Sequence, residues 1–264
     1  GSGFSSLSTA CYLSKKGYKV SIFEKNKNFG GRARQFKSDG FTFDMGPSWY
    51  WMPDVFERFF NDFGKKVSDL YELKKLNPAY RVIFDKNSQF EIEDNINSIV
   101  KLFEKHEKGS GKKLEAFMKE AKDNYDLAVT NMLYKMPGLS PLELVNSKTI
   151  AKANLFLTNI KKQIEKRFKN HKLRSILQFP VLFLGAKPSN TPAFYNFMNY
   201  ADFGLGTWQP KNGFFDVVKA MVKIAKENGV KFYNNCNIDK IEVKNGQVYG
   251  ISINNKIHKC DILV

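Results

Sequence analysis

The first residues of the chain have the types and spacing of a nucleotide-binding turn. Gly1-Ser2-Gly3-Phe4-Ser5-Ser6 is a glycine fingerprint in which Ser6 replaces the third glycine. A turn of this kind opens a helix whose first backbone N–H groups can bind a pyrophosphate. Glu24 comes 21 positions after Gly3, where a carboxylate can accept hydrogen bonds from the ribose hydroxyls of an adenosine. These residues predict a dinucleotide site.

Further segments with the same chemistry follow closely. In Phe29-Gly30-Gly31-Arg32-Ala33-Arg34, two glycines let the backbone approach a phosphate, and Arg32 supplies a planar cation for its oxygens. Phe43-Asp44-Met45-Gly46-Pro47-Ser48 offers another tight backbone approach. The fingerprint alone would also fit a glycine turn beside a solvated acid, but the spaced segments agree with one ligand.

Together these segments resemble the FAD-binding segment shared by amine oxidases, protoporphyrinogen oxidase and carotenoid desaturases. Longer stretches are similar to the bacterial-type phytoene desaturases, namely Asp44–Pro53, Phe179–Gly185, Asn190–Ala193, Met198–Tyr200 and Gly206–Phe214. In the last stretch that family usually shows Pro-x-Gly-Gly-Met, and Asn212 and Phe214 depart from this pattern. The resemblance covers nearly all 264 residues, and it implies a fragment that lacks the family's first strand and C-terminal portion.

The resemblance implies FAD as the cofactor and a set of residues that contact it. These are Gly1, Gly3, Ser6, Glu24, Lys25, Gly30, Gly31, Arg32, Met45, Gly46, Pro47, Ser48 and Ile238. It places Ile238 on a strand whose backbone meets the adenine, and it makes residues 261–264 the start of a strand that returns to the flavin domain. No residue is assigned as acid or base, and no metal site is expected.

The substrate implied by the resemblance is a long apolar polyene, an acyclic carotenoid. The flavin would take a hydride from an allylic carbon while a proton leaves the neighbouring carbon, most directly converting phytoene toward lycopene. Aromatic and methionine side chains that could line an apolar tunnel, or simply pack in the core, are Trp49, Trp51, Met52, Phe194, Phe197, Met198, Tyr200 and Trp208.

The elements around these motifs predict an α/β fold. Residues 4–16 have apolar side chains at helical spacing before Gly17, and residues 18–23 alternate like a strand. Beyond a hairpin at 36–44, a second set of signals gives a helix at 215–225 and strands at 230–233, 238–243, 247–253 and 261–264. We therefore predict a discontinuous, Rossmann-like FAD-binding domain, residues 1–78 and 212–264, interrupted by a mainly helical substrate and membrane domain, residues 79–211.

The interrupting segment is rich in lysine. Paired strands are predicted at 80–84 and 89–92, helices over 95–134 broken at Gly109-Ser110-Gly111, and a loop at Pro137–Pro141. Residues 150–172 predict one basic amphipathic helix, with apolar residues at Ile150, Leu157, Ile160, Ile164 and Phe168. Its apolar face could lie on an anionic membrane or pack in the interior of a soluble domain.

Composition limits the setting. Lys+Arg number 42 against 26 Asp+Glu, and the net charge of +16 favours anionic partners; no nucleic-acid reading module is present, so we expect no nucleic acid. Three scattered cysteines predict neither a disulfide framework nor a zinc site and fit a reducing cytoplasm. No apolar run approaches the roughly 18 residues of a transmembrane helix. We expect a cytoplasmic protein peripherally associated with the inner face of the cell membrane.

Other functions remain open at this point. A sister carotenoid enzyme, such as a hydroxycarotenoid 3,4-desaturase or a diapophytoene desaturase, would share the same FAD domain. A flavin amine oxidase would share it too, with a compact aromatic cage for a polar amine. A basic protein that adheres to membranes is the non-enzymatic alternative.

Overall fold

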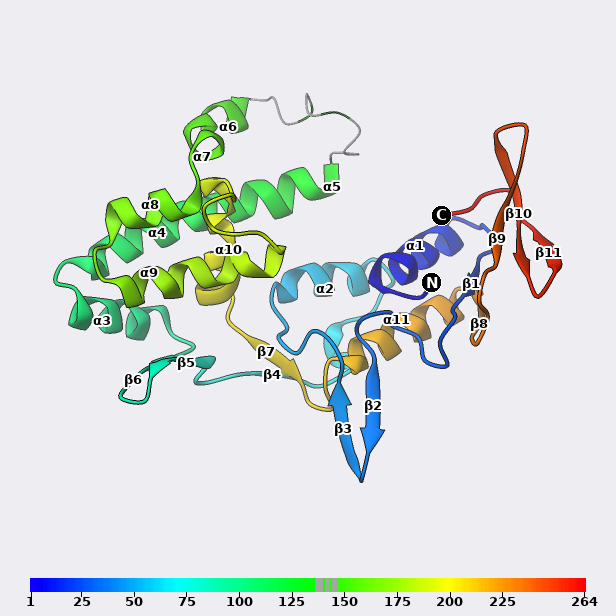
Figure 1. The fold of residues 1–264 in the computed structure, drawn as a ribbon, viewed down its shortest axis with the longest axis horizontal. Coiled ribbons are helices and arrows are strands. Elements are labelled where there is room, and N and C mark those ends of the chain that lie inside the picture. Colours follow the sequence, from blue (N-terminus) through cyan, green and yellow to red (C-terminus); the bar gives the residue numbers. More distant parts are fainter. Residues whose placement is uncertain (136–139, 141–142, 144–146) are drawn as a thin grey trace. The chain divides into compact units, whose positions relative to one another are not determined.

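The computed structural model describes residues 1–135, 140, 143 and 147–264, and it divides the chain into two compact units (Figure 1). Unit 1 comprises residues 1–50, 54–74 and 209–264, and unit 2 comprises residues 51–53 and 75–208. Unit 1 is thus discontinuous in sequence. The main boundaries between the units, at 74/75 and 208/209, lie a few residues from the domain boundaries predicted at 78/79 and 211/212. The FAD-binding and substrate roles predicted for these segments remain predictions.

Unit 1 contains a parallel strand pair formed by distant parts of the chain. β1 (Ser21–Phe23) pairs with β8 (Lys231–Tyr233), with Ser21 opposite Lys231. α1 (Phe4–Lys15) and α11 (Phe215–Glu227) pack against each other, and α1 buries Leu7, Ala10 and Cys11. Gly17 and Gly229 follow these helices with positive φ angles of 91° and 84°, as expected for C-terminal glycines.

The rest of unit 1 consists of short elements. β2 (Gln35–Ser38) and β3 (Phe41–Asp44) form the predicted antiparallel hairpin. α2 (Pro53–Asn61) and the 3-10 turn η1 (Val67–Asp69) follow. β9 (Lys240–Lys244), β10 (Gln247–Ile253) and β11 (Lys256–Lys259) form an antiparallel sheet in the order β11-β10-β9. Its first turn is the predicted Asn245-Gly246, with φ angles of 51° and 77°.

Unit 2 is mostly helical. The hairpin of β5 (Tyr80–Asp85) and β6 (Ser88–Ile92) leads into α3 (Ile96–His106) and α4 (Ser110–Tyr125), which are separated by Gly109 as predicted. The elements that follow are η2 (Asp126–Met132), α5 (Leu133–Lys135), α6 (Ser147–Ile150), α7 (Ala153–Leu157), α8 (Ile160–Arg167), α9 (His171–Gln178), η4 (Phe179–Leu184), η5 (Ala193–Asn196), α10 (Phe197–Asn199) and η6 (Tyr200–Gly204). β4 (Leu73–Lys75) pairs with β7 (Trp208–Pro210) in a two-stranded sheet, and two boundaries between the units in the sequence fall within these strands.

The single helix predicted over residues 150–172 is wrong. Thr158 and Phe168 have extended backbones, and an asparagine caps a new helix one position after Thr158 and two positions after Phe168. The side chain of Asn159 accepts a hydrogen bond of 2.9 Å from the Lys162 N–H, and Asn170 does the same for Lys172. Asparagine at the N-cap stabilises the start of a helix, which accounts for the starts of α8 and α9. The segment comprises the end of α6, α7, α8 and the start of α9.

The later part of this segment's apolar face, from Ile160 to Phe168, faces the interior of unit 2, whereas Ile150 and Leu157 are exposed. Ile160, Ile164 and Phe168 are fully buried in a cluster that also contains Phe103 and Phe117. The Phe168 ring meets the Phe103 ring edge-on at 5.8 Å. These residues therefore stabilise the fold and are not exposed for membrane contact.

Residues 261–264 were expected to be a strand, but no strand among the described residues pairs with them, and an unpaired extended segment has no ladder to stabilise it. The strand found instead is β11. Apart from Ser140, the predicted loop Pro137–Pro141 lies outside the described residues. In the described ranges no helix is both long and apolar enough to cross a membrane.

Candidate functional site: a pocket at the start of α1

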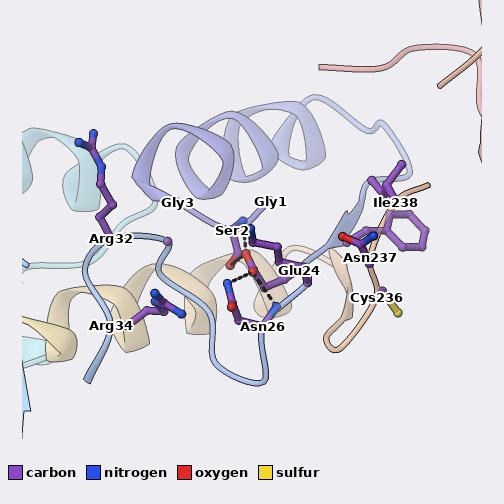
Figure 2. A pocket seen from close by; sticks show the side chains of 13 residues that line it. Gly1, Ser2, Gly3, Glu24, Asn26, Arg32, Arg34, Cys236, Asn237 and Ile238 are labelled. Carbon is purple, nitrogen blue, oxygen red and sulfur yellow. Dashed lines mark hydrogen bonds between the residues drawn. The ribbon is translucent and has the colours of Figure 1, made fainter. Parts of the chain in front are cut away.

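A pocket of about 460 Å³ in unit 1 brings together distant parts of the sequence (Figure 2). It is lined by Gly1, Ser2, Gly3, Phe23, Glu24, Lys25, Asn26, Gly31, Arg32, Arg34, Cys236, Asn237 and Ile238. In Figure 2 the two arginines lie on one side of Glu24, and Cys236, Asn237 and Ile238 lie on the other. The segments thus meet because β1 and β8 pair in parallel and both end at the pocket.

The glycines allow the backbone to close around this pocket. Gly3 is the N-cap of α1 and has no side chain to cap the helix, so the N-terminal end of the helix faces the pocket without an intervening group. Gly31 has a φ angle of 59°, and a Cβ there would lie 3.1 Å from the Gly3 Cα. Backbone N–H groups at a helix N-terminus bind anions, and the close approach of these glycines leaves room for one.

Glu24 is the acidic residue that lines the pocket, and hydrogen bonds fix both oxygens of its carboxylate. It is 3% exposed, and its Oε2 accepts hydrogen bonds from the Ser2 N–H at 2.9 Å and the Ser2 hydroxyl at 2.7 Å. Its Oε1 accepts from the backbone N–H of Asn26 at 2.9 Å and from the Asn26 amide at 2.6 Å. The backbone of Glu24 also bonds Tyr233 and Cys236, which extends the β1–β8 pairing to this residue.

These contacts determine the charge of Glu24. Burial acts to raise the pKa of its carboxyl, but the hydrogen bonds from Ser2 and Asn26 outweigh burial and lower the pKa below its ordinary value. Glu24 is therefore a carboxylate at neutral pH, the form that accepts hydrogen bonds from ribose hydroxyls.

Ser2 connects three parts of the site. Besides its two bonds to Glu24, its hydroxyl accepts a hydrogen bond of 3.2 Å from the Gly30 N–H, which also donates to the Ser2 carbonyl at 3.0 Å. The side chain is fully buried. Ser2 is thus a positioning residue between the fingerprint, the acidic end of β1 and the Gly30-Gly31 turn.

Positive charge lies on the side of the pocket opposite Ile238. Arg32 and Arg34 both line the pocket, and the Nε of Arg34 is buried without a hydrogen-bond partner among the described residues. Buried donors are normally satisfied. A phosphate oxygen is a suitable acceptor for a guanidinium, so the residues present fit the pyrophosphate and adenosine parts of FAD.

The pocket contains only part of the predicted set. Gly1, Gly3, Glu24, Lys25, Gly31, Arg32 and Ile238 line it, whereas Ser6, Gly30, Met45, Gly46, Pro47 and Ser48 do not. Gly46 has a packing role, because a Cβ at this position would lie 2.2 Å from the Arg32 carbonyl oxygen. Ile238 precedes β9 and is not within a strand, contrary to expectation.

Sequence reasoning missed several lining residues: Ser2, Phe23, Asn26, Arg34, Cys236 and Asn237. Arg34 belongs to the segment Phe29–Arg34 and Asn26 lies two positions after Glu24, so their polar side chains were a usable signal. Cys236 and Asn237 carry no such signal, because the parallel pairing of β8 with β1 places them here. In the part of the chain that is described, no group of three or more His, Cys, Asp or Glu residues could hold a metal ion.

Comparison with known proteins agrees with this site. Residues 4–263 match the family model described as flavin containing amine oxidoreductase. A carotenoid 3,4-desaturase of Haloarcula japonica is 38% identical over 91% of this chain and 49% of its own length. A zeta-carotene-forming phytoene desaturase of Myxococcus xanthus is 28% identical over 96% of this chain and 49% of its own.

Solved structures share the fold of this chain. An oxidoreductase from Methanosarcina mazei matches with a TM-score of 0.63 and 21% identity, over 99% of this chain and 56% of that one. The chain spans about half the length of the curated relatives it matches. The predicted similarity to carotenoid desaturases is confirmed. With a family match over nearly its whole length, the chain belongs to the family of flavin containing amine oxidoreductases, and this membership supports FAD as the cofactor.

Proposed function

We propose that the full-length protein is an FAD-dependent carotenoid desaturase. The observation that supports this most strongly is the pocket in which a buried, charged Glu24 faces the N-terminus of α1. This arrangement suits an adenosine diphosphate moiety, and the relatives named above act on carotenoids by their names. When bound, FAD supplies the hydride acceptor for the reaction.

We assign the two units different tasks. Unit 1 would be the discontinuous, Rossmann-like FAD-binding domain, with the parallel β1–β8 pair and the α1 N-terminus at its centre. Ser2, Glu24, Arg32 and Arg34 would hold the cofactor, together with the backbone at Gly3. Unit 2 would be the substrate domain. Of the residues considered for a tunnel, Phe194 and Met198 are 4% and 8% exposed and act in packing, whereas Trp51 is partly exposed.

The substrate would be an acyclic carotenoid, with phytoene converted toward lycopene as one candidate. The greater identity to a carotenoid 3,4-desaturase than to a phytoene desaturase, 38% against 28%, favours 3,4-desaturation as the second candidate. Amine oxidation is a third reaction open to this family.

A membrane is the expected source of so apolar a substrate, and we propose that the protein lies in the cytoplasm against the inner face of the cell membrane. With Ile160, Ile164 and Phe168 buried, the residues suited to this contact are Ile150 and Leu157, which are 61% and 89% exposed. The exposed Lys161 and Lys162 begin the next helix and could meet acidic head groups.

The decisive experiment uses the purified full-length protein. Its visible spectrum reports bound flavin, and anaerobic incubation with phytoene or with a carotenoid substrate of 3,4-desaturation in liposomes is followed by chromatography of the products. Flavin reduction with a more unsaturated product supports the proposal and identifies the substrate. Turnover of amines without turnover of either carotenoid would contradict it.

A further inference from the structure

Donors of the chain itself occupy the acceptor positions of the Glu24 carboxylate (Figure 2). Its Oε2 accepts hydrogen bonds from the N–H and the hydroxyl of Ser2 at 2.9 and 2.7 Å. Its Oε1 accepts hydrogen bonds from the N–H and the side-chain amide of Asn26 at 2.9 and 2.6 Å. Because an ionised carboxylate has about four lone-pair positions, a ribose hydroxyl can bond Glu24 only in place of one of these donors.

Three of these donors are held by the fold. The N–H groups of Ser2 and Asn26 belong to the backbone, and the Asn26 carbonyl accepts a hydrogen bond of 3.2 Å from the Asn235 N–H. The Ser2 hydroxyl is fully buried, and it also accepts a hydrogen bond of 3.2 Å from the Gly30 N–H. Its place on Oε2 therefore belongs to the interior of unit 1, and its departure would break two hydrogen bonds.

The side-chain amide of Asn26 is the donor that can leave. Asn26 is half-buried and lines the pocket. Among the described residues this amide bonds only Glu24 Oε1, so its rotation breaks one hydrogen bond, and water can then bind the amide. A hydroxyl that enters the pocket thus has an accessible acceptor position on Oε1.

The bond from the Asn26 amide also stabilises the protein before a nucleotide binds. Glu24 is 3% exposed, and a buried carboxylate that loses a donor costs free energy. A ribose hydroxyl that takes the same position on Oε1 replaces the lost donor. The bond therefore stabilises the apoprotein and not the loaded protein, and it reduces the affinity by the fraction of apoprotein molecules in which the amide has already left.

We propose that the Asn26 amide holds the position on Glu24 Oε1 that a ribose hydroxyl of FAD takes, and that this hydroxyl replaces the amide when the cofactor binds. Asn26 is then a determinant of cofactor affinity, since it stabilises the apoprotein and weakens the binding of nucleotides that have ribose hydroxyls. The inference rests on the part of the proposed function that places the adenosine of FAD in this pocket.

The test measures FAD binding to the apo form of the full-length protein by flavin fluorescence. In Asn26→Ala the Kd for FAD should fall about fivefold, because the ribose hydroxyl no longer competes with an amide. The Kd for an FAD analogue built on 2′,3′-dideoxyadenosine should stay at its wild-type value, because this analogue has no ribose hydroxyl to exchange. Asn28→Ala is the matched control, an exposed asparagine outside the pocket lining, and should keep both wild-type values.

The other outcomes of this titration overturn the inference. An unchanged or higher Kd for FAD in Asn26→Ala would show that the amide does not compete with the cofactor. An equal fall in Kd for FAD and for the dideoxy analogue would show a wider pocket in place of an exchange at Glu24. If the wild type binds no FAD, the proposed function fails, and that result is distinct from binding that Asn26→Ala does not strengthen.

A second readout follows the stability of the two forms. The Tm of the apoprotein should be about 1–2 °C lower in Asn26→Ala than in the wild type, because Glu24 has lost a donor. The Tm of the FAD-loaded protein should be the same in both, because the ribose hydroxyl takes that position. An equal decrease in both forms would show that the amide supports Glu24 throughout, and it would overturn the inference.

Discussion

The carboxylate of Asp44 accepts a hydrogen bond of 2.7 Å from the backbone N–H of Phe214, 170 positions later in the chain. It thereby joins β3 to the start of α11 inside unit 1. Gly213 makes the approach possible, since its φ angle is 92° and a Cβ there would lie 2.5 Å from the Asp44 Oδ2. The segment in which Asn212 and Phe214 depart from the family pattern is thus anchored through its retained glycine.

Asp44→Ala should destabilise unit 1 by about 1–3 kcal/mol, because it leaves the Phe214 N–H without its acceptor beside a side chain that is 5% exposed. Urea unfolding measures the change. Asp39→Asn, at the exposed tip of the same hairpin, is the control and should stay within roughly 0.5 kcal/mol of wild type. Equal stability of the two variants would show that the Asp44 bond does not stabilise the fold.

Ser2→Ala should weaken FAD binding without unfolding the protein. The variant removes the 2.7 Å hydrogen bond to Glu24 and one of the two acceptors of the Gly30 N–H, and it leaves the Ser2 carbonyl as the other. A rise in Kd of about tenfold is expected, equivalent to ~1.4 kcal/mol, and flavin fluorescence during titration measures it. Ser5→Ala, on the exposed side of α1, removes a hydroxyl of the same kind and should leave Kd unchanged. A Kd for Ser2→Ala equal to that of Ser5→Ala would refute the positioning role.

The lowered pKa of Glu24 predicts a stability that depends on pH. Since the folded-state pKa lies below the unfolded value of about 4.3, the carboxylate stabilises the fold above that pH. This contribution is lost as the pH falls through the folded-state pKa. The Tm, measured by thermal unfolding between pH 3 and 7, should therefore decrease less steeply with falling pH for Glu24→Gln than for the wild type. The exposed Glu115→Gln should follow the wild type, and an unchanged slope for Glu24→Gln would contradict the prediction.

Leu157→Ser should reduce binding to vesicles that contain anionic lipid, because the leucine is 89% exposed and available for insertion. Cosedimentation measures the bound fraction, and unfolding should be unaffected. Ile83→Ser removes another apolar side chain of unit 2, 69% exposed on β5, and serves as the control. Equal loss of binding in both variants would indicate general surface hydrophobicity in place of a defined contact.

Local signals in the sequence predicted local structure well. Gly17 and Gly229 end their helices, Gly109 separates α3 from α4, and Asn245-Gly246 forms its hairpin turn. The prediction of one helix over residues 150–172 also failed on local signals, the N-cap residues within that segment. Asn159 and Asn170 are good N-cap residues, yet the helical spacing of the apolar residues around them concealed two helix starts.

Contacts between residues far apart in the chain could not be predicted from local sequence patterns. The fingerprint and Glu24 predicted one half of the pocket, because a strand and a helix next to each other carry that pattern. The place of Cys236 and Asn237 depends on the pairing of β8 with β1, which no local pattern encodes. The hydroxyl of Tyr80 donates a hydrogen bond to the carboxyl of Asp202, 122 positions later, and neither residue stands in a motif that would associate them. Residues 261–264 read as a strand by composition, but a strand also needs a neighbour.

The discontinuity of unit 1 has a consequence for synthesis on the ribosome. β1 emerges early, but its partner β8 follows only after the whole of unit 2, a delay of about 10–40 s at typical rates of elongation. Unit 2 has nearly all of its sequence in one stretch, so it can fold during this interval. The nascent N-terminal segment, with its apolar α1 face, must meanwhile stay unpaired or be held by a chaperone. Cys236, Asn237 and Ile238, which follow β8, line the pocket, so the pocket is complete only after β8 is made, and we expect FAD to be loaded late.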